Sequence, residues 1–379
     1  MPGSVVKRPN GRWRARYRDP SKREHARDFR RKIDAERWLA SVETAKSRGE
    51  WLDPVLGKMT FGKWAERWLA GQSQLRPSTH DRYGRILEHQ ILPWWDLVPL
   101  AAVNHADVVA WVGDLVGKGY APATVRQAHR VFSLVLMLAV RDGRLNRNVA
   151  QGVRLPRVVQ QEKTFLTHEQ VSQLAVACGP YELFVTFLAY TGLRWGEFAA
   201  LRAKHVYLLR RRVTVAESAS EVQGVMAFGP TKTHQRRVVV LPRFLVEPLA
   251  EHLRGKAPDD LVFSAPNGGV LRNSNFRHRV LTPAAASVGL VGLSPHDLRH
   301  TAASLAIAAG ANVKVVQQMM GHASAAMTLD VYAGLFGDDL DSVAESLDAA
   351  ARRSRADISR TADATAEVLR LPAKRSSVG

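Results

Sequence analysis

Cysteine and long apolar runs are scarce in this sequence of 379 residues. Cys178 is the only cysteine, so the chain can form neither an internal disulfide nor a zinc site with several thiolates. The longest largely apolar stretch, 131–140, lies between Arg130 and Arg141 and is far shorter than a membrane-spanning helix. No apolar segment follows the basic N-terminus, so we expect neither a signal peptide nor a membrane partner. These absences favour a cytoplasmic protein.

Acidic residues are also outnumbered. The chain has 54 Lys and Arg against 35 Asp and Glu, a formal net charge of +19, and its pI is about 10.6. Such an excess favours a polyanionic partner, either nucleic acid or a membrane surface. Because no membrane segment accompanies the charge, we expect nucleic acid. Hydrophobic residues make up 46% of the chain, enough for folded domains, and the length predicts two or three of them.

The first 32 residues carry twelve Lys or Arg and three Asp or Glu. Basic side chains recur there at every second position: Arg12, Arg14, Arg16 and Arg18. A period of two predicts a strand with one charged face. We expect a further strand near 24–30 and an amphipathic helix over 33–48, which together give a sheet of about three strands backed by a helix. The arginine face is predicted to contact DNA; a solvated charged surface is the alternative.

The pattern becomes helical between residues 60 and 148. Four helices are expected to begin near Thr60, Pro77, Asn104 and Ala121. Most of their Trp and Leu side chains should form a core. A polar segment with Pro156 follows over 152–163 and is typical of a linker. The next part is predicted to be mainly helical, with β-prone runs over 211–216, 225–228 and 237–241.

These changes of pattern divide the chain into five parts. They are a sheet-and-helix domain over 1–58, a helical domain over 59–151, the linker over 152–163, a mixed α/β domain over 164–340, and a C-terminal helix and tail over 341–379. The fold class is therefore multidomain and mainly α, with small β-sheets. The C-terminal helix is expected over 339–353.

Four short segments of the mixed α/β domain carry residues suited to chemistry. Arg194 follows the end of an apolar helix, and Lys232 lies between two β-prone runs, where we expect a hairpin turn. The segment 296–300, His-Asp-Leu-Arg-His, opens a helix, and Gly321-His322 ends another one ten residues before Tyr332. Each residue alone has an ordinary explanation, as a surface ion pair, a cap, a solvated charge or a core tyrosine.

Together these residues supply what metal-free phosphodiester transfer requires. The transition state spreads negative charge over the nonbridging oxygens, and the forked guanidinium groups of Arg194 and Arg299 can neutralise it. Tyr332 offers a phenolic oxygen that attacks in line and leaves a phosphotyrosine. Lys232 can give a proton to the departing sugar oxygen, although Lys204 lies nearby in sequence.

Three further side chains have assisting roles in this hypothesis. His296 and His322 can donate hydrogen bonds to phosphate oxygens or manage the proton of the tyrosine. Glu197 is expected to orient an arginine.

The order Arg, Lys, His-x-x-Arg, Gly-His, Tyr resembles the catalytic constellation of the tyrosine recombinases, or phage integrases. The segments 191–197, 296–301 and 320–322 resemble the family's two arginine motifs and its Leu-Gly-His motif, with Met320 in place of Leu. The resemblance implies that Arg194 and Arg299 clamp the scissile phosphate, Lys232 is the general acid, and His296 and His322 assist. It also implies that Tyr332 forms a 3′-phosphotyrosyl bond, without metal or other cofactor.

The resemblance extends to the other parts of the chain. The helical domain is similar to the family's core-binding domain, and the N-terminal part to the arm-binding domain of phage integrases. Expected partners are double-stranded attachment sites, a homotetramer on paired sites, a host DNA-bending protein and an excision factor. The implied function is integration and excision of phage or other mobile DNA in the cytoplasm of a bacterial host, in association with the nucleoid.

Three alternatives remain open on sequence grounds. A type IB topoisomerase shares the chemistry but does not pair two DNAs. A DNA-binding protein of the same fold would not need the nucleophile. A zinc hydrolase is suggested by His296 and His300, four residues apart on a helix, but the residue after the first histidine is Asp297 instead of glutamate.

Overall fold

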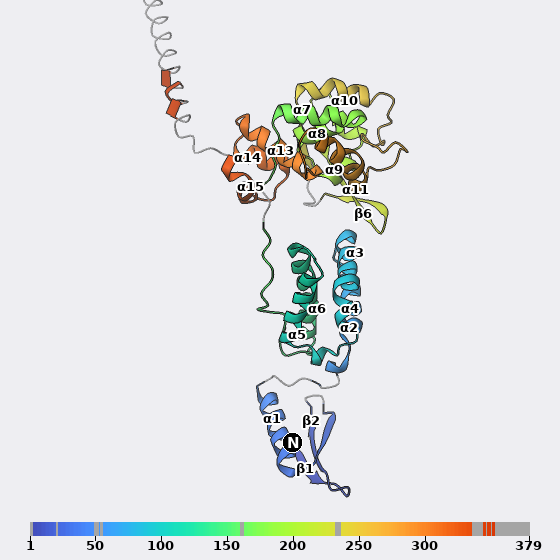
Figure 1. The fold of residues 1–379 in the computed structure, drawn as a ribbon, viewed down its shortest axis with the longest axis vertical. Helices are drawn as coiled ribbons and strands as arrows, with labels where there is room; N and C mark the ends of the chain where they lie inside the picture. The colour runs from blue at the N-terminus through green and yellow to red at the C-terminus, as the bar shows by residue number, and fades with distance from the viewer. Residues whose placement is uncertain are drawn as a thin grey trace, which may run out of the picture. The chain divides into compact units, whose positions relative to one another are not determined.

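The computed structural model of the chain comprises two compact units. The first contains residues 1–162 with 220–227, and the second contains residues 163–219 with 228–379. The structure describes residues 3–19, 22–48, 53, 56–159, 163–231, 236–335, 344–345, 347–349 and 351–352. Figure 1 gives the order of the elements along the chain.

The N-terminal part is a three-stranded sheet with one helix, as the alternating pattern predicts. Its elements are β1 (Ser4–Lys7), β2 (Trp13–Arg18), β3 (Glu24–Phe29) and α1 (Lys32–Ser47). The strands are antiparallel in the order β1-β2-β3, and α1 packs against them. Ala15 and Tyr17 are buried, and the Tyr17 ring lies 5.5 Å from the Trp38 ring of α1. The alternation of β2 thus separates an apolar face from an arginine face.

Acidic residues of β3 partly neutralise the arginine face. The guanidinium of Arg14 donates two hydrogen bonds to Asp28, at 2.8 and 3.1 Å, and Arg16 lies 3.8 Å from Glu24. The register causes this, because Arg14 is directly opposite Asp28 in the β2–β3 ladder. The basic face predicted for this strand thus also includes carboxylates of β3. The exposed arginines of the set are Arg12 and Arg18.

The helical part of the first unit has the expected helices. They are α2 (Phe61–Ala70), α3 (Pro77–Ile86), α4 (Leu92–Trp95), α5 (His105–Gly117) and α6 (Pro122–Arg141). The side chain of Thr60 caps α2 by accepting a hydrogen bond from the Lys63 N–H. Asn104 caps α5 in the same way, at 3.0 Å from the N–H of Asp107. Both helix starts are confirmed.

Phe132 lies at the centre of the core that these helices enclose. Its ring is 4.8 Å from that of Phe61, 4.9 Å from Trp95 and 5.0 Å from Trp111. All four side chains are at most 1% exposed. The tryptophans of this part are therefore mainly core residues, as predicted, and aromatic packing contributes much of the buried area.

Two π-helical turns precede prolines. One spans Leu87–Ile91, between α3 and α4, and the other spans Arg277–Leu281, between α11 (Asn273–Phe276) and α12 (Thr282–Ser287). Pro93 and Pro283 follow them. Because a proline has no N–H and its ring clashes with the preceding turn, the wider turn lets the helical path continue. The helix that begins at Pro77 therefore continues through the π-helical turn and α4 to Trp95.

The second unit is mainly helical. Besides α11 and α12 it contains α7 (His168–Ala177), α8 (Glu182–Thr191), α9 (Trp195–Ala199), α10 (Val246–His252), α13 (Pro295–Ala308), α14 (Val313–Met320) and α15 (Ala325–Tyr332). Single 3₁₀ turns occur in both units at Leu56–Lys58, Leu100–Ala102, Gly179–Tyr181, Ala203–His205, Arg243–Leu245 and Ala333–Leu335. Helices α7 and α13 both pack against α8, which makes α8 central to this unit.

The pairing of the strands in residues 206–230 and 237–240 corrects the prediction of a hairpin turn at Lys232. Strands β4 (Val206–Tyr207), β5 (Arg212–Val215) and β8 (Arg237–Val240) form one antiparallel sheet, and β6 (Glu217–Val222) pairs with β7 (Val225–Pro230). Gln223 and Gly224, both with positive φ, make the tight turn that closes β6 onto β7. Strand β7 is thus paired with β6, while β8 is paired with β5. Lys232 itself lies outside the described residues.

The segment expected to be a linker is ordered at its start. Val153 and Leu155 pack against the core of the helical part, and the Arg126 side chain donates a hydrogen bond to the Pro156 carbonyl at 3.3 Å. Of the expected C-terminal helix, residues 344–345, 347–349 and 351–352 are described and are helical. None of the described helices has both the length and the apolar character needed to cross a membrane.

Candidate active site

Arg194 stands at the junction of two helices. Helix α8 ends at Gly192, which has a φ of 64°, and Arg194 is the extended residue before α9. A Cβ atom on Gly192 would lie 2.8 Å from the sulfur of Met320, so glycine is required for its space as well as its conformation. The Glu197 carboxylate accepts a hydrogen bond from the backbone N–H of Arg194 at 2.9 Å. The turn and the cap together fix where the arginine side chain begins.

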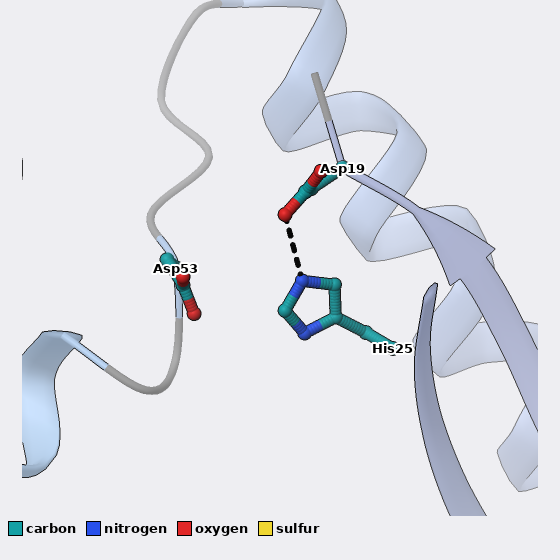
Figure 2. A group of neighbouring side chains, drawn as sticks. All are labelled: Asp19, His25 and Asp53. Atoms are coloured by element: carbon teal, nitrogen blue, oxygen red, sulfur yellow. Dashed lines mark hydrogen bonds and ion pairs between the residues drawn. The ribbon is translucent and has the colours of Figure 1, made fainter. Parts of the chain in front are cut away.

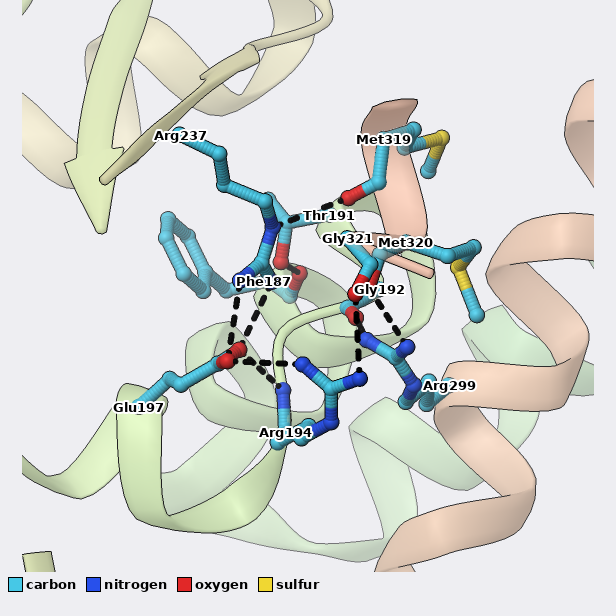
Figure 3. Close-up of polar contacts among 10 residues, drawn as sticks. All are labelled: Phe187, Thr191, Gly192, Arg194, Glu197, Arg237, Arg299, Met319, Met320 and Gly321. Atoms are coloured by element: carbon cyan, nitrogen blue, oxygen red, sulfur yellow. Dashed lines mark hydrogen bonds and ion pairs between the residues drawn. The ribbon is translucent and has the colours of Figure 1, made fainter. Parts of the chain in front are cut away.

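Glu197 is a buried anion shared by two arginines (Figure 3). It accepts a hydrogen bond from the Arg194 guanidinium at 3.0 Å and two from Arg237, at 2.9 and 2.6 Å. Burial opposes ionisation of this carboxyl, but the bonds and charges of Arg237 and Arg194 outweigh burial and hold its pKa below the usual value. Glu197 thus orients two arginines, where the sequence predicted one.

Arg237 is a site residue that the sequence analysis missed. It begins β8, its side chain is 11% exposed, and its Nε donates to the Met319 carbonyl at 3.2 Å. A signal was present in the strand pattern. Val239 is buried and shares a face of β8 with Arg237, while Val238 and Val240 are exposed. An arginine at a buried position of a strand requires an acidic partner.

Arg299 is the most buried of the arginines in the described part of the chain, at 2% exposure. It belongs to α13 and donates hydrogen bonds to the carbonyls of Gly192 and Met320, the latter at 2.6 Å. Burial, and then the positive charge of Arg194, lower its pKa to about 9. It therefore remains protonated at neutral pH, with its charge held in surroundings of low polarity.

The end of α14 meets all three guanidinium groups. Arg237, Arg299 and Arg194 donate to the successive carbonyls of residues 319, 320 and 321, at 3.2, 2.6 and 3.2 Å. The last carbonyls of a helix have no partner within it, and they lie at its negative end. Gly321 closes the helix with a φ of 62°, and a Cβ there would lie 2.9 Å from the Cδ of Arg237. The Gly-His motif thus brings α14 against the arginines.

The cluster carries a net charge of +2, from three guanidinium groups and one carboxylate. The side chain of Arg194 is 25% exposed, more than that of Arg237. An anion arriving from solvent would therefore meet Arg194 first. The arrangement suits the binding of a phosphate group, because its oxygens match the guanidinium fork.

The two predicted histidines lie beside this cluster and are neutral at pH 7. Desolvation by neighbouring groups, followed by the charge of Arg299, lowers the pKa of His296, whose surface is still partly open to solvent, and the same two causes lower the pKa of the half-buried His322 to about 4. His322 Nδ1 lies 2.9 Å from the Thr328 hydroxyl. Neutral rings can still donate one hydrogen bond each, which is the assistance predicted for them.

Tyr332 is the last residue of α15 and is 1% exposed. Its ring is parallel to that of His322, with the centroids 6.4 Å apart, and its hydroxyl lies 2.8 Å from Nδ1 of His300. Burial raises the pKa of Tyr332 to about 12, although Arg299 acts in the opposite direction. The structure therefore brings the tyrosine close to the arginines, together with a histidine that had been considered only as a zinc ligand.

The histidine pair does not match the zinc hypothesis. The His296 and His300 rings meet edge to face, with centroids 4.7 Å apart. Asp297 accepts hydrogen bonds from the N–H and hydroxyl of Ser294, so its carboxylate caps α13. Among the described residues, the histidine pair has no third His, Cys, Asp or Glu within reach of a shared ion.

Lys204, the alternative to Lys232 as the general acid, forms an exposed ion pair with Asp259.

A different group of possible ligands lies in the first unit (Figure 2). The ligand atoms of Asp19, His25 and Asp53 are within 4.8 Å of one another. Asp19 accepts hydrogen bonds from the His25 ring at 3.0 Å and from the Arg23 N–H at 2.8 Å. These bonds close the turn between β2 and β3. Asp19 and His25 therefore have a structural explanation in the turn itself.

Three family models match the chain in order. They are "Phage integrase, N-terminal domain" over residues 1–48, "Phage integrase central domain" over 61–155 and "Phage integrase family" over 164–336. The integrase of Mycobacterium phage D29 is 28% identical over 346 residues, which cover 86% of this chain and 91% of that protein. The integrase of Mycobacterium phage L5 is 26% identical over 371 residues, covering 93% and 98%.

Solved structures show the same fold. A Tn1549 transposon integrase in complex with a circular intermediate DNA matches with a TM-score of 0.65 and 21% identity, covering 76% of this chain and 99% of that one. A lambda integrase dimer bound to a COC′ core site matches with a TM-score of 0.57 and 17% identity, covering 88% and 94%.

The chain belongs to the phage integrase family of tyrosine recombinases. It is accordingly a site-specific DNA recombinase, and the topoisomerase and DNA-binding alternatives are not favoured.

Proposed function

We propose that the arginine cluster binds the scissile phosphate and that Tyr332 is the covalent nucleophile. Arg194 and Arg299 clamp the nonbridging oxygens, and His296 and His322 donate further hydrogen bonds. The Tyr332 oxygen attacks phosphorus, the bond to the 5′-oxygen breaks, and Lys232 gives the departing oxygen its proton. The single observation that carries this proposal is the net positive cluster of guanidinium groups, whose buried member Arg299 is followed directly by His300, the residue in contact with the Tyr332 hydroxyl.

The buried position of Tyr332 adds a requirement. At 1% exposure its hydroxyl cannot meet a phosphate unless the site opens. Because Arg194 is the more exposed arginine, we expect the phosphate to enter on its side and to displace the bond from Arg194 to the Gly321 carbonyl. This exchange replaces a neutral acceptor with an anionic one, which forms stronger hydrogen bonds.

We further propose a division of labour along the chain. Residues 1–58 bind arm-type DNA sites through Arg12, Arg14, Arg16 and Arg18. The helical domain, residues 59–151, binds the core site, and the segment 152–163 links it to the catalytic domain. The catalytic domain, residues 164–340, carries out strand cleavage and rejoining, and a helix and tail follow over 341–379. The basic β2 face, with exposed arginines at its ends, supports the first assignment.

The partners we propose are double-stranded attachment sites and three further copies of the chain. A lambda integrase tetramer bound to a Holliday junction shares the fold, with a TM-score of 0.55 over 86% of this chain, which supports a tetramer on paired sites. A host DNA-bending protein and an excision factor complete the proposed assembly for integration and excision of mobile DNA. With its pI of about 10.6, the protein should associate with the nucleoid of a bacterial host.

A suicide substrate tests the nucleophile. The DNA, drawn from sequences that flank the protein's own gene, carries a nick beside the crossover, so that cleavage releases a short fragment and traps the covalent complex. We expect a protein–DNA adduct on denaturing gels in the presence of chelator, with the modification on Tyr332 by mass spectrometry. Tyr332→Phe should bind the same DNA and form no adduct.

Tyr190→Phe is the matched control. The Tyr190 hydroxyl also contacts Nδ1 of a histidine, His168, at 2.6 Å in the same unit, whereas the guanidinium groups of the cluster donate to Glu197 and to backbone carbonyls. This variant should form the adduct at the wild-type rate. An adduct on another residue, or normal cleavage by Tyr332→Phe, would refute the assignment.

A further inference from the structure

Two histidines, His300 and His322, lie beside Tyr332 and a third, His296, lies against the first; among these described residues His300 is the one that contacts the Tyr332 hydroxyl. His300 Nδ1 lies 2.8 Å from the hydroxyl, with the two ring centroids 5.7 Å apart. The ring of His322 lies parallel to that of Tyr332, and its Nδ1 is next to the Thr328 hydroxyl. His296 lies against the ring of His300. The geometry therefore distinguishes His300 from the two histidines that the family motif indicates.

His300 is held in place by its helix. It follows Arg299 directly on α13, and Arg299 is anchored by the carbonyls of Gly192 and Met320. Tyr332 ends α15, and the segment before α7 contributes Phe165, whose ring is 6.3 Å from that of Tyr332. The bond between His300 and Tyr332 thus joins α13 to α15 at the edge of the arginine cluster.

The surroundings define which group donates. Burial, and then the neighbouring His296, lower the pKa of His300 to about 4, so its ring is neutral at pH 7. Burial raises the pKa of Tyr332 to about 12, so the hydroxyl keeps its proton. Nδ1 is then the acceptor and the hydroxyl the donor. The ionisable groups that act on the pair are His296, Asp297 and Arg299 on α13, Lys163 before α7, and His322 after α14.

We propose that His300 is a catalytic residue that orients the Tyr332 hydroxyl and receives its proton during cleavage. The proposal rests on Tyr332 being the nucleophile. As the bond from Oη to phosphorus forms and the bond from phosphorus to the 5′-oxygen breaks, the phenolic proton passes to Nδ1. The 5′-oxygen takes its proton from the general acid on the other side. In religation the 5′-hydroxyl attacks, and the imidazolium of His300 returns its proton to the leaving tyrosine oxygen.

A sulfur-substituted substrate distinguishes a base that acts on the tyrosine nucleophile from an acid that acts on the leaving group. In a 5′-bridging phosphorothiolate the leaving group is a thiolate, which departs without a proton because of its low pKa. Loss of the general acid is therefore rescued by this substrate, while loss of a base on the nucleophile is not. We expect His300→Leu to slow adduct formation at Tyr332 about 100-fold or more on the oxygen and the sulfur substrate alike. Lys232→Ala should recover on sulfur.

Two further variants make the result specific. His300→Asn places an amide oxygen near the position of Nδ1, so it keeps a hydrogen-bond acceptor but is not a base. It should bind DNA normally and still cleave slowly. His168→Leu, which removes the histidine beside Tyr190, should cleave at the wild-type rate.

The pH profile tests the proton transfer itself. On the sulfur substrate, wild-type cleavage should be flat between about pH 6 and 9, because neutral His300 is available throughout this range. In His300→Asn the rate should rise about tenfold per pH unit, since only the ionised fraction of Tyr332 attacks. A residue with a merely structural role would leave the shape of the profile unchanged.

The outcomes separate this proposal from the one on which it rests. No adduct on Tyr332 by the wild-type protein, on a site that it binds, overturns the nucleophile assignment. A wild-type adduct together with a near-normal rate in both His300 variants overturns the role of His300 alone. Rescue by sulfur would place His300 on the leaving-group side, and faster cleavage by the variants would show that the bond only restrains Tyr332. Slow, unrescued cleavage with a rising pH profile supports the proposal.

Discussion

Two of the pairs in which an arginine donates two hydrogen bonds to one carboxylate differ in burial, and this difference has consequences. In the N-terminal sheet, Arg14 donates two bonds to Asp28 in contact with solvent, where water and salt screen the charges. In the second unit, Arg237 donates two bonds to Glu197, whose side chain is completely buried. The exposed pair can exchange partners with DNA at little cost, while the buried pair holds a site in shape.

The largest effect should follow from altering the buried cluster at its exposed edge. Arg194→Lys removes the fork that faces the incoming phosphate, and an ammonium group cannot replace two parallel N–H donors. We expect adduct formation to fall by about 100- to 1000-fold with the fold intact. The matching change Arg14→Lys should leave the cleavage rate unchanged. Single-turnover cleavage of the suicide substrate measures both, and near-normal activity of Arg194→Lys would make Arg194 a structural residue.

The next effect concerns stability. Glu197→Gln leaves Arg237 and Arg194 without their buried counter-charge, which should destabilise the protein by about 3 to 5 kcal/mol. Asp28→Asn, in the exposed pair, should shift the denaturation curve much less. Urea denaturation of the two variants gives the comparison directly. Equal shifts would show that burial does not distinguish the pairs.

The pH dependence of this difference has a definite sign. The pKa of Glu197 is lowered in the folded protein, so the stability that it contributes is present above the ordinary carboxyl pKa and is lost as the pH falls through the folded value. The gap between wild type and Glu197→Gln should therefore persist near pH 7 and narrow in acid. A gap that stays constant down to about pH 3 would contradict the shift.

The partly buried histidines His300 and His322 predict a second acid effect, over a higher pH range. The pKa values of His300 and His322 are lowered to about 4, so below pH 6.5 the unfolded chain takes up protons that the folded one does not. Their contribution is lost progressively between pH 6.5 and 4. The double variant His300→Asn with His322→Asn should lose less stability than wild type over this interval, as followed by denaturation at each pH. An identical loss would exclude the histidines as the cause.

The smallest effect is expected on the arginine face of the N-terminal sheet. Arg18→Gln should weaken DNA binding and lower the salt dependence by about one counterion, if the side chain contacts a phosphate. Because Arg14 is held by Asp28, Arg14→Gln should change the salt slope less. Binding titrations over a range of salt concentrations test whether Arg18→Gln lowers the salt dependence more than Arg14→Gln does. Deletion of residues 1–58 should weaken binding to one class of sites and spare cleavage at the core site.

Much of the fold followed from local patterns. The alternation of β2 and the caps at Thr60 and Asn104 each depend on neighbouring residues, so they were predictable. Lys232 was assigned to a hairpin because two β-prone runs flank it, but the Gln223-Gly224 turn had already paired β7 with β6. Which strands pair depends on competition between neighbouring strands for the same partner. The positions of the β-prone segments in the sequence do not show the result of that competition.

The residues of the candidate site also divide into those that local sequence predicts and those that it does not. Arg194, Arg299 and Tyr332 were recognisable because their motifs are local in sequence. Arg237 and His300 were not, since their roles depend on contacts with residues 40 and 32 positions away.

The sequence by itself determined the residue types, the helix and strand starts, the family and the excess of positive charge. Only the tertiary structure decided that three arginines converge on the last carbonyls of α14, and that His300, among three histidines, contacts the tyrosine oxygen. The physical reason is the separation along the chain over which each kind of interaction acts. Propensities and caps act between residues a few positions apart, whereas the burial of a charge requires partners that only the packing of α8, α13, α14 and β8 brings together.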